Sequence, residues 1–134
     1  MLEIDGTLLL EVVGGADALH DPRSFTVPIR EAHLDALRES LRRHVLLRGV
    51  LLPLCDAAGI GGPWDEGAAA ALLDPVLLGA PTEVDIALRQ GRVDRRVLIA
   101  HHASMTLLKQ RRYYEAMQSA TATTDWARVR RLIG

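Results

Sequence analysis

The chain has 134 residues, of which 49% are hydrophobic and 25% charged, and its formal net charge at pH 7 is −1. This composition excludes intrinsic disorder, because half of the residues can form an apolar core, and it predicts one globular domain over residues 1–134. The single cysteine, Cys55, excludes an internal disulfide. The sequence contains no apolar stretch of the roughly 20 residues that cross a bilayer and no signal-peptide pattern, so we expect a cytoplasmic protein.

Charge is unevenly distributed along the chain. Residues 1–67 hold 6 Arg and 11 Asp or Glu, a net charge of −5, whereas residues 68–134 hold 10 basic and 6 acidic residues, a net charge of +4. Opposite charges on the two halves can pair within one copy or between two copies, and the basic C-terminal third can also attract an anion. The basic residues are 15 Arg and one Lys, a bias that is typical of GC-rich bacterial genomes.

The first 30 residues predict β-strands. Asp5-Gly6 between two apolar segments is typical of a hairpin turn. A two-residue loop pairs Glu3 with Leu8, whereas a bulge or an odd-numbered loop gives the alternative register, and both remain open. Residues 24–29 alternate between apolar and polar side chains. Pro28 lacks an N–H, so this strand should lie at a sheet edge or end there.

Residues 31–58 predict one long central helix. Apolar residues first recur at three- and four-residue spacing, and from Val45 to Ala58 nearly every residue is apolar. A helix that is apolar on all sides must be buried on all sides, so this segment either crosses the core or is covered by a second copy. Pro53 removes the hydrogen bond to the carbonyl of Gly49, which predicts a bend.

The second half of the chain predicts shorter elements and completes the fold class. The class is α+β: a small antiparallel or mixed sheet of about four strands, with four or five helices packed on one face. The elements expected after the Gly-rich loop at 59–63 are helices at 65–73 and 82–90, a short turn begun by Asp74-Pro75, a strand at 97–100, and helices from Met105 to about Ser119 and near the C-terminus.

His101 and His102 are the first candidates for a ligand site. They follow the predicted strand at 97–100, and crevices form at the carboxyl ends of strands in open sheets. Adjacent residues on a strand point to opposite faces, so the two imidazoles are not expected to share one metal ion. Trp64, which follows the Gly-rich loop, would add an aromatic wall. We therefore predict that His101, His102 and Trp64 contact a ligand.

Other chemically reactive side chains have simpler structural roles. Asp65 and Glu66 stand at a helix start, where carboxylates match the helix dipole. Cys55 lies in an apolar helix, where the pKa of a thiol is raised. The dipeptide His20-Asp21 resembles part of a metal phosphohydrolase site, but the other ligands are not convincingly placed. The sequence therefore predicts no catalytic residue, no metal ligand and no cofactor.

Residues 109–114 combine three cations with two tyrosines, a mixture that suits phosphate contact and base stacking. On a continuous helix, Tyr113 would face outward and Tyr114 inward. The candidate nucleic-acid-binding residues in this segment and in the C-terminal basic run are Arg111, Arg112, Arg128 and Arg131. The net charge of −1 makes nucleic acid an unlikely partner.

The sequence thus predicts function only as a class. The first hypothesis is a non-enzymatic binding or protein-interaction domain that acts as a homodimer or binds another protein. The alternative is nucleic-acid or anionic-ligand binding through the basic C-terminal third. A small metal-assisted hydrolase ranks third, because it requires two or more of His101, His102, Asp65 and Glu66 around one metal or water.

Overall fold

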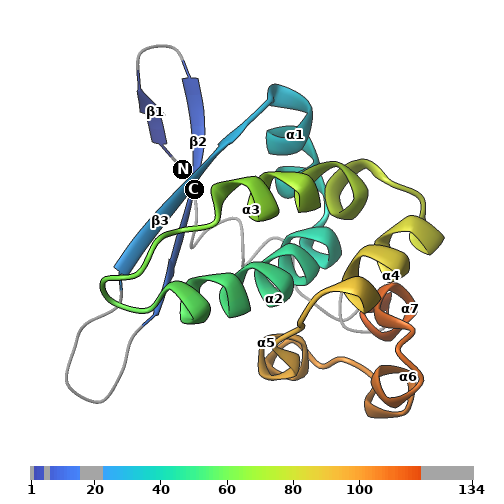
Figure 1. The fold of residues 1–134 in the computed structure, drawn as a ribbon. Coiled ribbons are helices and arrows are strands. Elements are labelled where there is room, and N and C mark those ends of the chain that lie inside the picture. The colour runs from blue at the N-terminus through green and yellow to red at the C-terminus, as the bar shows by residue number, and fades with distance from the viewer. Residues whose placement is uncertain (1, 5–6, 16–22, 119–134) are drawn as a thin grey trace.

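The computed structural model describes residues 2–4, 7–15 and 23–118, and it confirms the predicted α+β class with a long central helix (Figure 1). None of the described helices is long and apolar enough to span a membrane. The predicted C-terminal helix lies outside the described residues. The strands are β1 (Leu2–Ile4), β2 (Thr7–Gly14) and β3 (Arg23–Ile29), and the helices are α1 (Glu31–Glu39), α2 (Leu41–Ala58), α3 (Glu66–Leu73), the π-helical turn η1 (Asp74–Leu78), α4 (Pro81–Gln90), α5 (Arg95–Ala100), α6 (Met105–Lys109) and α7 (Tyr113–Ala116).

The described strands form one antiparallel sheet in the order β1-β2-β3. Glu3 pairs with Leu8 and Ile4 with Thr7, which is the register that a connection of two residues requires. β3 is an edge strand in which Pro28 is exposed, as the missing N–H of proline predicts. Three strands are described instead of the four that the sequence predicted, because residues 97–100 are helical.

The outer edge of β3 is covered by the chain that leads into α3. The indole N–H of Trp64 donates a hydrogen bond to the carbonyl of Thr26 (2.9 Å), and the Trp64 ring packs on Phe25 with 4.8 Å between ring centroids. The guanidinium of Arg23 donates to the carbonyl of Gly62 (2.7 Å). These contacts block an edge that would otherwise be free to pair with another strand.

The prediction of one helix over residues 31–58 is wrong at Ser40. The backbone of Ser40 is extended, with φ −130° and ψ 101°, so it separates α1 from α2. Its hydroxyl accepts a hydrogen bond from the backbone N–H of Arg43 (3.2 Å) and caps α2. Serine favours this N-cap position, whereas the apolar pattern continues across it and gives no sign of a break.

The second helix, α2, is the centre of the core. It packs against β2, α1, α3, η1, α5 and α7. The apolar surface that predicted a second copy is therefore largely covered within one copy of the chain. The buried residues of α2 are Val45, Leu46, Leu47, Gly49, Val50, Leu51, Cys55 and Ala58.

Pro53 lies inside α2 without ending it. Because proline has no N–H, the carbonyl of Gly49 lacks its usual helical donor, and it accepts a hydrogen bond from the backbone N–H of Asp94 instead (2.7 Å). Gly49 also leaves room for Leu98, since a Cβ at position 49 would lie 3.2 Å from Leu98 Cδ2. The turn before α5 is thus attached to α2. A bend at Pro53 stays a prediction.

The predicted strand at 97–100 is wrong because Asp94 begins a helix there. The Asp94 carboxylate accepts a hydrogen bond from the backbone N–H of Arg96 (3.1 Å), which caps α5. The Arg96 guanidinium also bonds this carboxylate (3.0 and 3.1 Å). A run of four apolar residues does not by itself distinguish a buried strand from a short helix. Here the cap formed by Asp94 favours the helix.

The short turn predicted at Asp74-Pro75 is η1, which follows α3 directly, and Leu73 rather than Asp74 is at its N-cap. The Asp74 carboxylate instead accepts hydrogen bonds from α1 and its cap: from Nε2 of His33 (2.6 Å) and from the guanidinium of Arg30 (2.5 Å). Nδ1 of His33 accepts from the backbone N–H of Arg30 (3.0 Å), so Nε2 carries the proton. This cluster ties α1 to η1.

The single helix predicted from Met105 to about Ser119 is interrupted. Ser104 caps α6 as predicted, but Arg111 has a φ of +58°, and α7 begins afterwards. The guanidinium of Arg111 donates to the carbonyl of Arg89 (2.7 Å), and that of Arg89 donates to the carbonyl of Arg111 (3.0 Å). The break changes the helical phase, so Tyr113 is only 3% exposed instead of facing outward.

We predict that replacing Gly49 with Val lowers the free energy of unfolding by about 2 kcal/mol, because the new side chain would displace Leu98. Gly67 is the matched control: its position in α3 is exposed, and the nearest atom to a Cβ there is Asp65 Oδ1 at 3.7 Å. Gly67→Val should change stability by at most about 0.5 kcal/mol. Urea denaturation measures both values, and equal losses would contradict the close contact between Gly49 and Leu98.

The hydrogen bond from His33 and the nearby Arg30 lower the pKa of the Asp74 carboxyl. A carboxylate with a lowered pKa stabilises the fold above its unfolded pKa of about 3.9, and this stabilisation is lost as the pH falls through the folded pKa. Asp74→Asn should therefore lower stability at pH 7 and flatten the loss of stability below about pH 4. Denaturation at stepped pH tests this, with exposed Asp35→Asn as control. An unchanged profile for Asp74→Asn would refute the role of this cluster.

Candidate functional site

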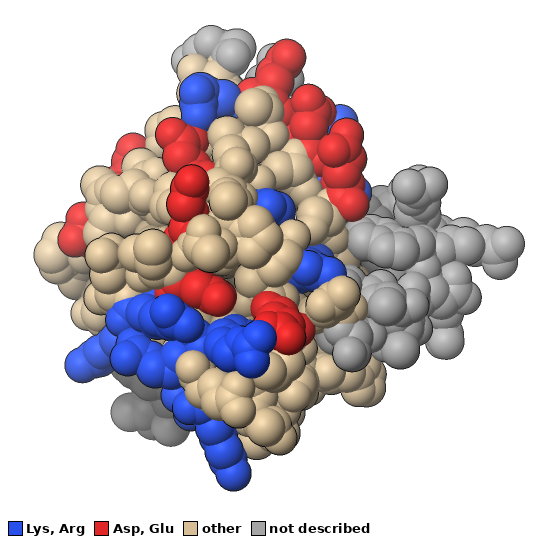
Figure 2. Space-filling view, turned by 90° about the vertical axis from the view of Figure 1, so that its right-hand side faces the viewer, with Lys and Arg blue, Asp and Glu red and all other residues tan. Residues whose placement is uncertain are grey.

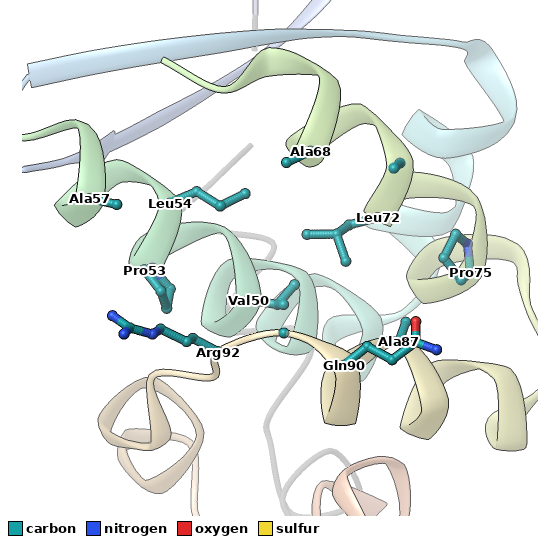
Figure 3. Close-up of a pocket in the computed structure, with 12 residues that line it drawn as sticks. Val50, Pro53, Leu54, Ala57, Ala68, Leu72, Pro75, Ala87, Gln90 and Arg92 are labelled. Atoms are coloured by element: carbon teal, nitrogen blue, oxygen red, sulfur yellow. The ribbon is translucent and has the colours of Figure 1, made fainter. Parts of the chain in front are cut away.

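A cleft of about 600 Å³ runs along α2, between α3 and the end of α4 (Figure 3). Val50, Pro53 and Leu54 of α2 form its floor. Leu54 and Leu72 point into the space between their helices, and Gln90 lies along the opposite rim. The other lining residues are Ala57, Ala68, Ala71, Pro75, Ala87, Gly91 and Arg92.

The cleft exists because small residues line both of its walls. α3 presents Ala68 and Ala71, and the opposite wall presents Ala87 and Gly91. Alanine favours a helix, but its methyl group cannot fill the space above α2. As a result, Leu54 and Leu72 remain half-buried although they belong to apolar faces. The cleft is therefore an apolar surface that stays accessible to water.

The cleft continues into a second hollow at the turn between α4 and α5. The two depressions share Pro53, Ala57 and Arg92, and together we call them the α2 groove. In the second hollow, Arg96 is paired with Asp94 (3.0 Å), and hydrogen bonds from Arg96 lower the pKa of the Asp94 carboxyl. The hollow is also lined by Asp56, Val93 and Arg95.

Two arginines at this end of the groove are free to bind an external anion. Arg92 and Arg95 are exposed and make no hydrogen bond or ion pair with any described residue. In Figure 3 the Arg92 side chain extends along the rim beside Pro53. Arg96 is already engaged by Asp94. The α2 groove thus changes along its length from an apolar surface to a surface with two unpaired positive charges.

The predicted ligand contacts His101, His102 and Trp64 are not brought together. Trp64 is engaged with β3, as described above. His101 is the C-cap of α5 rather than the end of a strand, and His102 follows it with a φ of +65°. Burial, together with the charges of Arg48 and His102, lowers the pKa of His101. His101 is thus near enough to Arg48 of α2 to be influenced by its charge, whereas Trp64 contacts β3, and the ligand role of all three residues stays a prediction.

The acidic and thiol candidates have the structural roles that the sequence indicated. Asp65 caps α3 by accepting from the backbone N–H of Ala68 (3.0 Å), and Glu66 lies in the first turn. Burial raises the pKa of the Cys55 thiol to about 11. In the part of the chain that is described, no three His, Cys, Asp or Glu side chains are grouped so that they could hold a metal ion. His20 and Asp21 lie outside that part.

The basic candidates differ in their surroundings. Figure 2 shows Lys and Arg gathered toward the lower end of the face that carries α4, with most of the Asp and Glu side chains above them. Arg112 forms an ion pair with Glu115, and Arg111 donates to the backbone of Arg89 (2.7 Å). These two guanidinium groups are therefore partly engaged in contacts within the protein. Arg128 and Arg131 lie outside the described residues.

Sequence reasoning missed the groove itself. The basic C-terminal third includes Arg92 and Arg95, and this signal could have identified them. The sequence predicts the Ala-rich segment 68–73 as part of a helix, but it does not reveal which neighbouring element leaves space beside that helix. Leu54 and Leu72 carry no sign that distinguishes them from core leucines.

The comparisons with known proteins identify a family but no activity. No curated protein matches the chain, and no solved structure matches it. A family model matches residues 1–132, which is nearly the whole chain. The chain therefore belongs to a family of unknown function, DUF6357.

Proposed function

We propose that this protein is a protein-interaction domain that holds an amphipathic helix of another polypeptide in the α2 groove, without transforming it chemically. The observation that carries the proposal is the continuity of the groove. Its apolar part, between α2 and α3, leads directly to the unpaired Arg92 and Arg95. An occupant needs an apolar stripe next to an acidic end.

The shape of the groove favours a helix as the occupant. Two helices form its walls and α2 forms its floor, so a bound helix would pack as helices do in protein cores. The small side chains of Ala68, Ala71 and Ala87 let a backbone approach closely, while Leu54 and Leu72 supply apolar contact. The occupant would place apolar residues at i, i+3, i+4 and i+7 along this surface.

Charge complementarity defines the acidic end of the occupant. A carboxylate beside Arg92 and Arg95 would gain two guanidinium partners that have no other described partner. Such pairs at an exposed rim mainly set specificity and association rate. The occupant is therefore expected to carry Asp or Glu at the end that lies over the turn between α4 and α5.

Several polar side chains are engaged in structural hydrogen bonds, and this supports binding without catalysis. An enzyme site must bring together an acid or base, a nucleophile and a charge stabiliser. Both ring nitrogens of His33 are engaged in hydrogen bonds, and Asp65 and Asp94 cap helices. The alternative of nucleic-acid binding is less well supported, because Arg112 is neutralised by Glu115.

The sequence predicted a homodimer, and a second copy would be a specific kind of occupant. The burial of most apolar residues of α2 within one copy removes the main reason for that expectation. We therefore propose a separate polypeptide as the partner, and self-association becomes an outcome of the test.

Selection from a displayed library of random 16-residue peptides tests the proposal. We expect enriched peptides to share an i, i+4, i+7 apolar pattern with Asp or Glu near one end. Ala71→Glu, a change at an exposed position in the groove wall, should weaken their binding at least tenfold, or about 1.4 kcal/mol. Ile99→Glu, at an exposed position on α5, is the control and should leave binding unchanged.

Reversal of the charges at the basic end of the groove provides a second test of the proposal. The double variant Arg92→Glu and Arg95→Glu should select peptides with Lys or Arg at the corresponding end. The proposal is wrong if no peptide is enriched, or if the enriched peptides bind the Ala71→Glu variant normally. A dimer that Ala71→Glu dissociates in analytical ultracentrifugation would identify a second copy as the occupant and overturn the separate partner.

A further inference from the structure

A second cavity, distinct from the α2 groove, lies between β2 and the first half of α2. Its volume is about 280 Å³, just below the range of about 300–1,000 Å³ that is usual for small-molecule sites. Buried apolar side chains form its floor, and charged or titratable side chains stand at its rim. The floor includes Val12, Leu47 and Leu51, and the rim includes His44, Arg48 and Glu11.

The helical spacing of α2 brings two basic side chains to one side of this cavity. His44 and Arg48 are four residues apart, so they lie on the same face of the helix, and both line the cavity. His101, at the end of α5, lies close enough to His44 and Arg48 that their charges influence one another. His102 extends this basic group.

Basic side chains outnumber acidic ones among the residues that line this cavity. Arg48 makes no described hydrogen bond or ion pair. Glu11 of β2 is the acidic group that lines the cavity, and its carboxylate accepts a hydrogen bond from the hydroxyl of Ser24 (2.8 Å). The charged and titratable groups that line the cavity are therefore Arg48, His44 and Glu11, and the charges of His101 and His102 act on this group from the end of α5.

We propose that this cavity binds a small organic acid, with the carboxylate at Arg48 and His44 and the apolar body against Leu47 and Leu51. Arg48 supplies a permanent charge, and the imidazoles supply N–H donors. The apolar floor favours an acid with a hydrocarbon or aromatic body over a bare anion. This site is independent of the α2 groove, because the two cavities have no lining residue in common.

Binding should become stronger as the pH falls. Partial burial, Arg48 and His101 lower the pKa of His44, and partial burial, Arg48 and His102 lower that of His101. A bound carboxylate opposes these effects and favours both imidazolium forms. Protons are then taken up on binding, so affinity should rise by up to about two log units per pH unit below pH 6.5. Glu11 opposes the anion, so Glu11→Gln should strengthen binding.

Titration with sodium benzoate, followed by NMR signals of the histidine side chains, tests the proposal. We expect saturable shifts of the His44 and His101 signals and at least tenfold tighter binding at pH 5.5 than at pH 7.5. Arg48→Gln should weaken binding at least tenfold at both pH values. His33, whose ring nitrogens are engaged, is the internal control, and Ala71→Glu should bind benzoate normally because it alters only the groove.

Two other anions define what the cavity recognises. Acetate, which lacks an apolar body, should bind at least fivefold more weakly than benzoate. Equal binding of acetate, or tighter binding of inorganic phosphate, would overturn the assignment to an organic acid. Linear shifts of all histidine signals, or unchanged binding by the Arg48→Gln variant, would show that no such site exists.

Discussion

Apolar residues from Val45 to Ala58 surround the axis of α2, so the rest of the chain must remove nearly all sides of this helix from water. A fully buried leucine contributes about 1.5–3 kcal/mol, and α2 contains several of them. The sheet lies against one side of α2, while α1, α3, η1, α5 and α7 contact others. The flank between α3 and α4 is left partly open, because alanines line it. The proposed binding surface is thus an apolar part of α2 that the fold leaves accessible.

The proline within α2 connects this packing to the charged end of the groove. Pro53 leaves the carbonyl of Gly49 without a helical donor, and the N–H of Asp94 takes that place (2.7 Å). The hydrogen bond fixes the start of α5, and with it the turn that carries Arg92 and Arg95. Pro53 also lines both depressions of the groove. One local defect in the helix therefore positions both the floor of the groove and its basic end.

The sequence predicted elements well where residue type and periodicity agree. The alternation of residues 24–29 and the missing N–H of Pro28 gave the edge strand, and the apolar run of α2 gave the central helix. Errors arose where a single capping residue overrides the apolar pattern of its neighbours. Ser40 divides a continuous apolar periodicity, and Asp94 turns a strand-like run into a helix. Arg111, with its positive φ, divides α6 from α7 and reverses the expected exposure of Tyr113.

The candidate site was harder to predict than the fold, since it is made of ordinary residues. Leu54, Leu72 and Ala71 become a site only because of the space between three helices, and no local pattern encodes that space. The residues chosen for their chemistry, Trp64 above all, are engaged within the fold. The uneven charge was the informative signal, because it places unpaired arginines in the second half of the chain.

Hydrogen–deuterium exchange of the full chain, with and without a selected peptide, tests the central claim most directly. The account predicts that the peptide slows exchange in three segments that border the groove: residues 50–57, 68–75 and 87–96. Exchange in β3 and α7 should stay unchanged. Slower exchange confined to β3 or to α5 and α6, with no effect on residues 68–75, would contradict the assignment of the α2 groove as the binding surface.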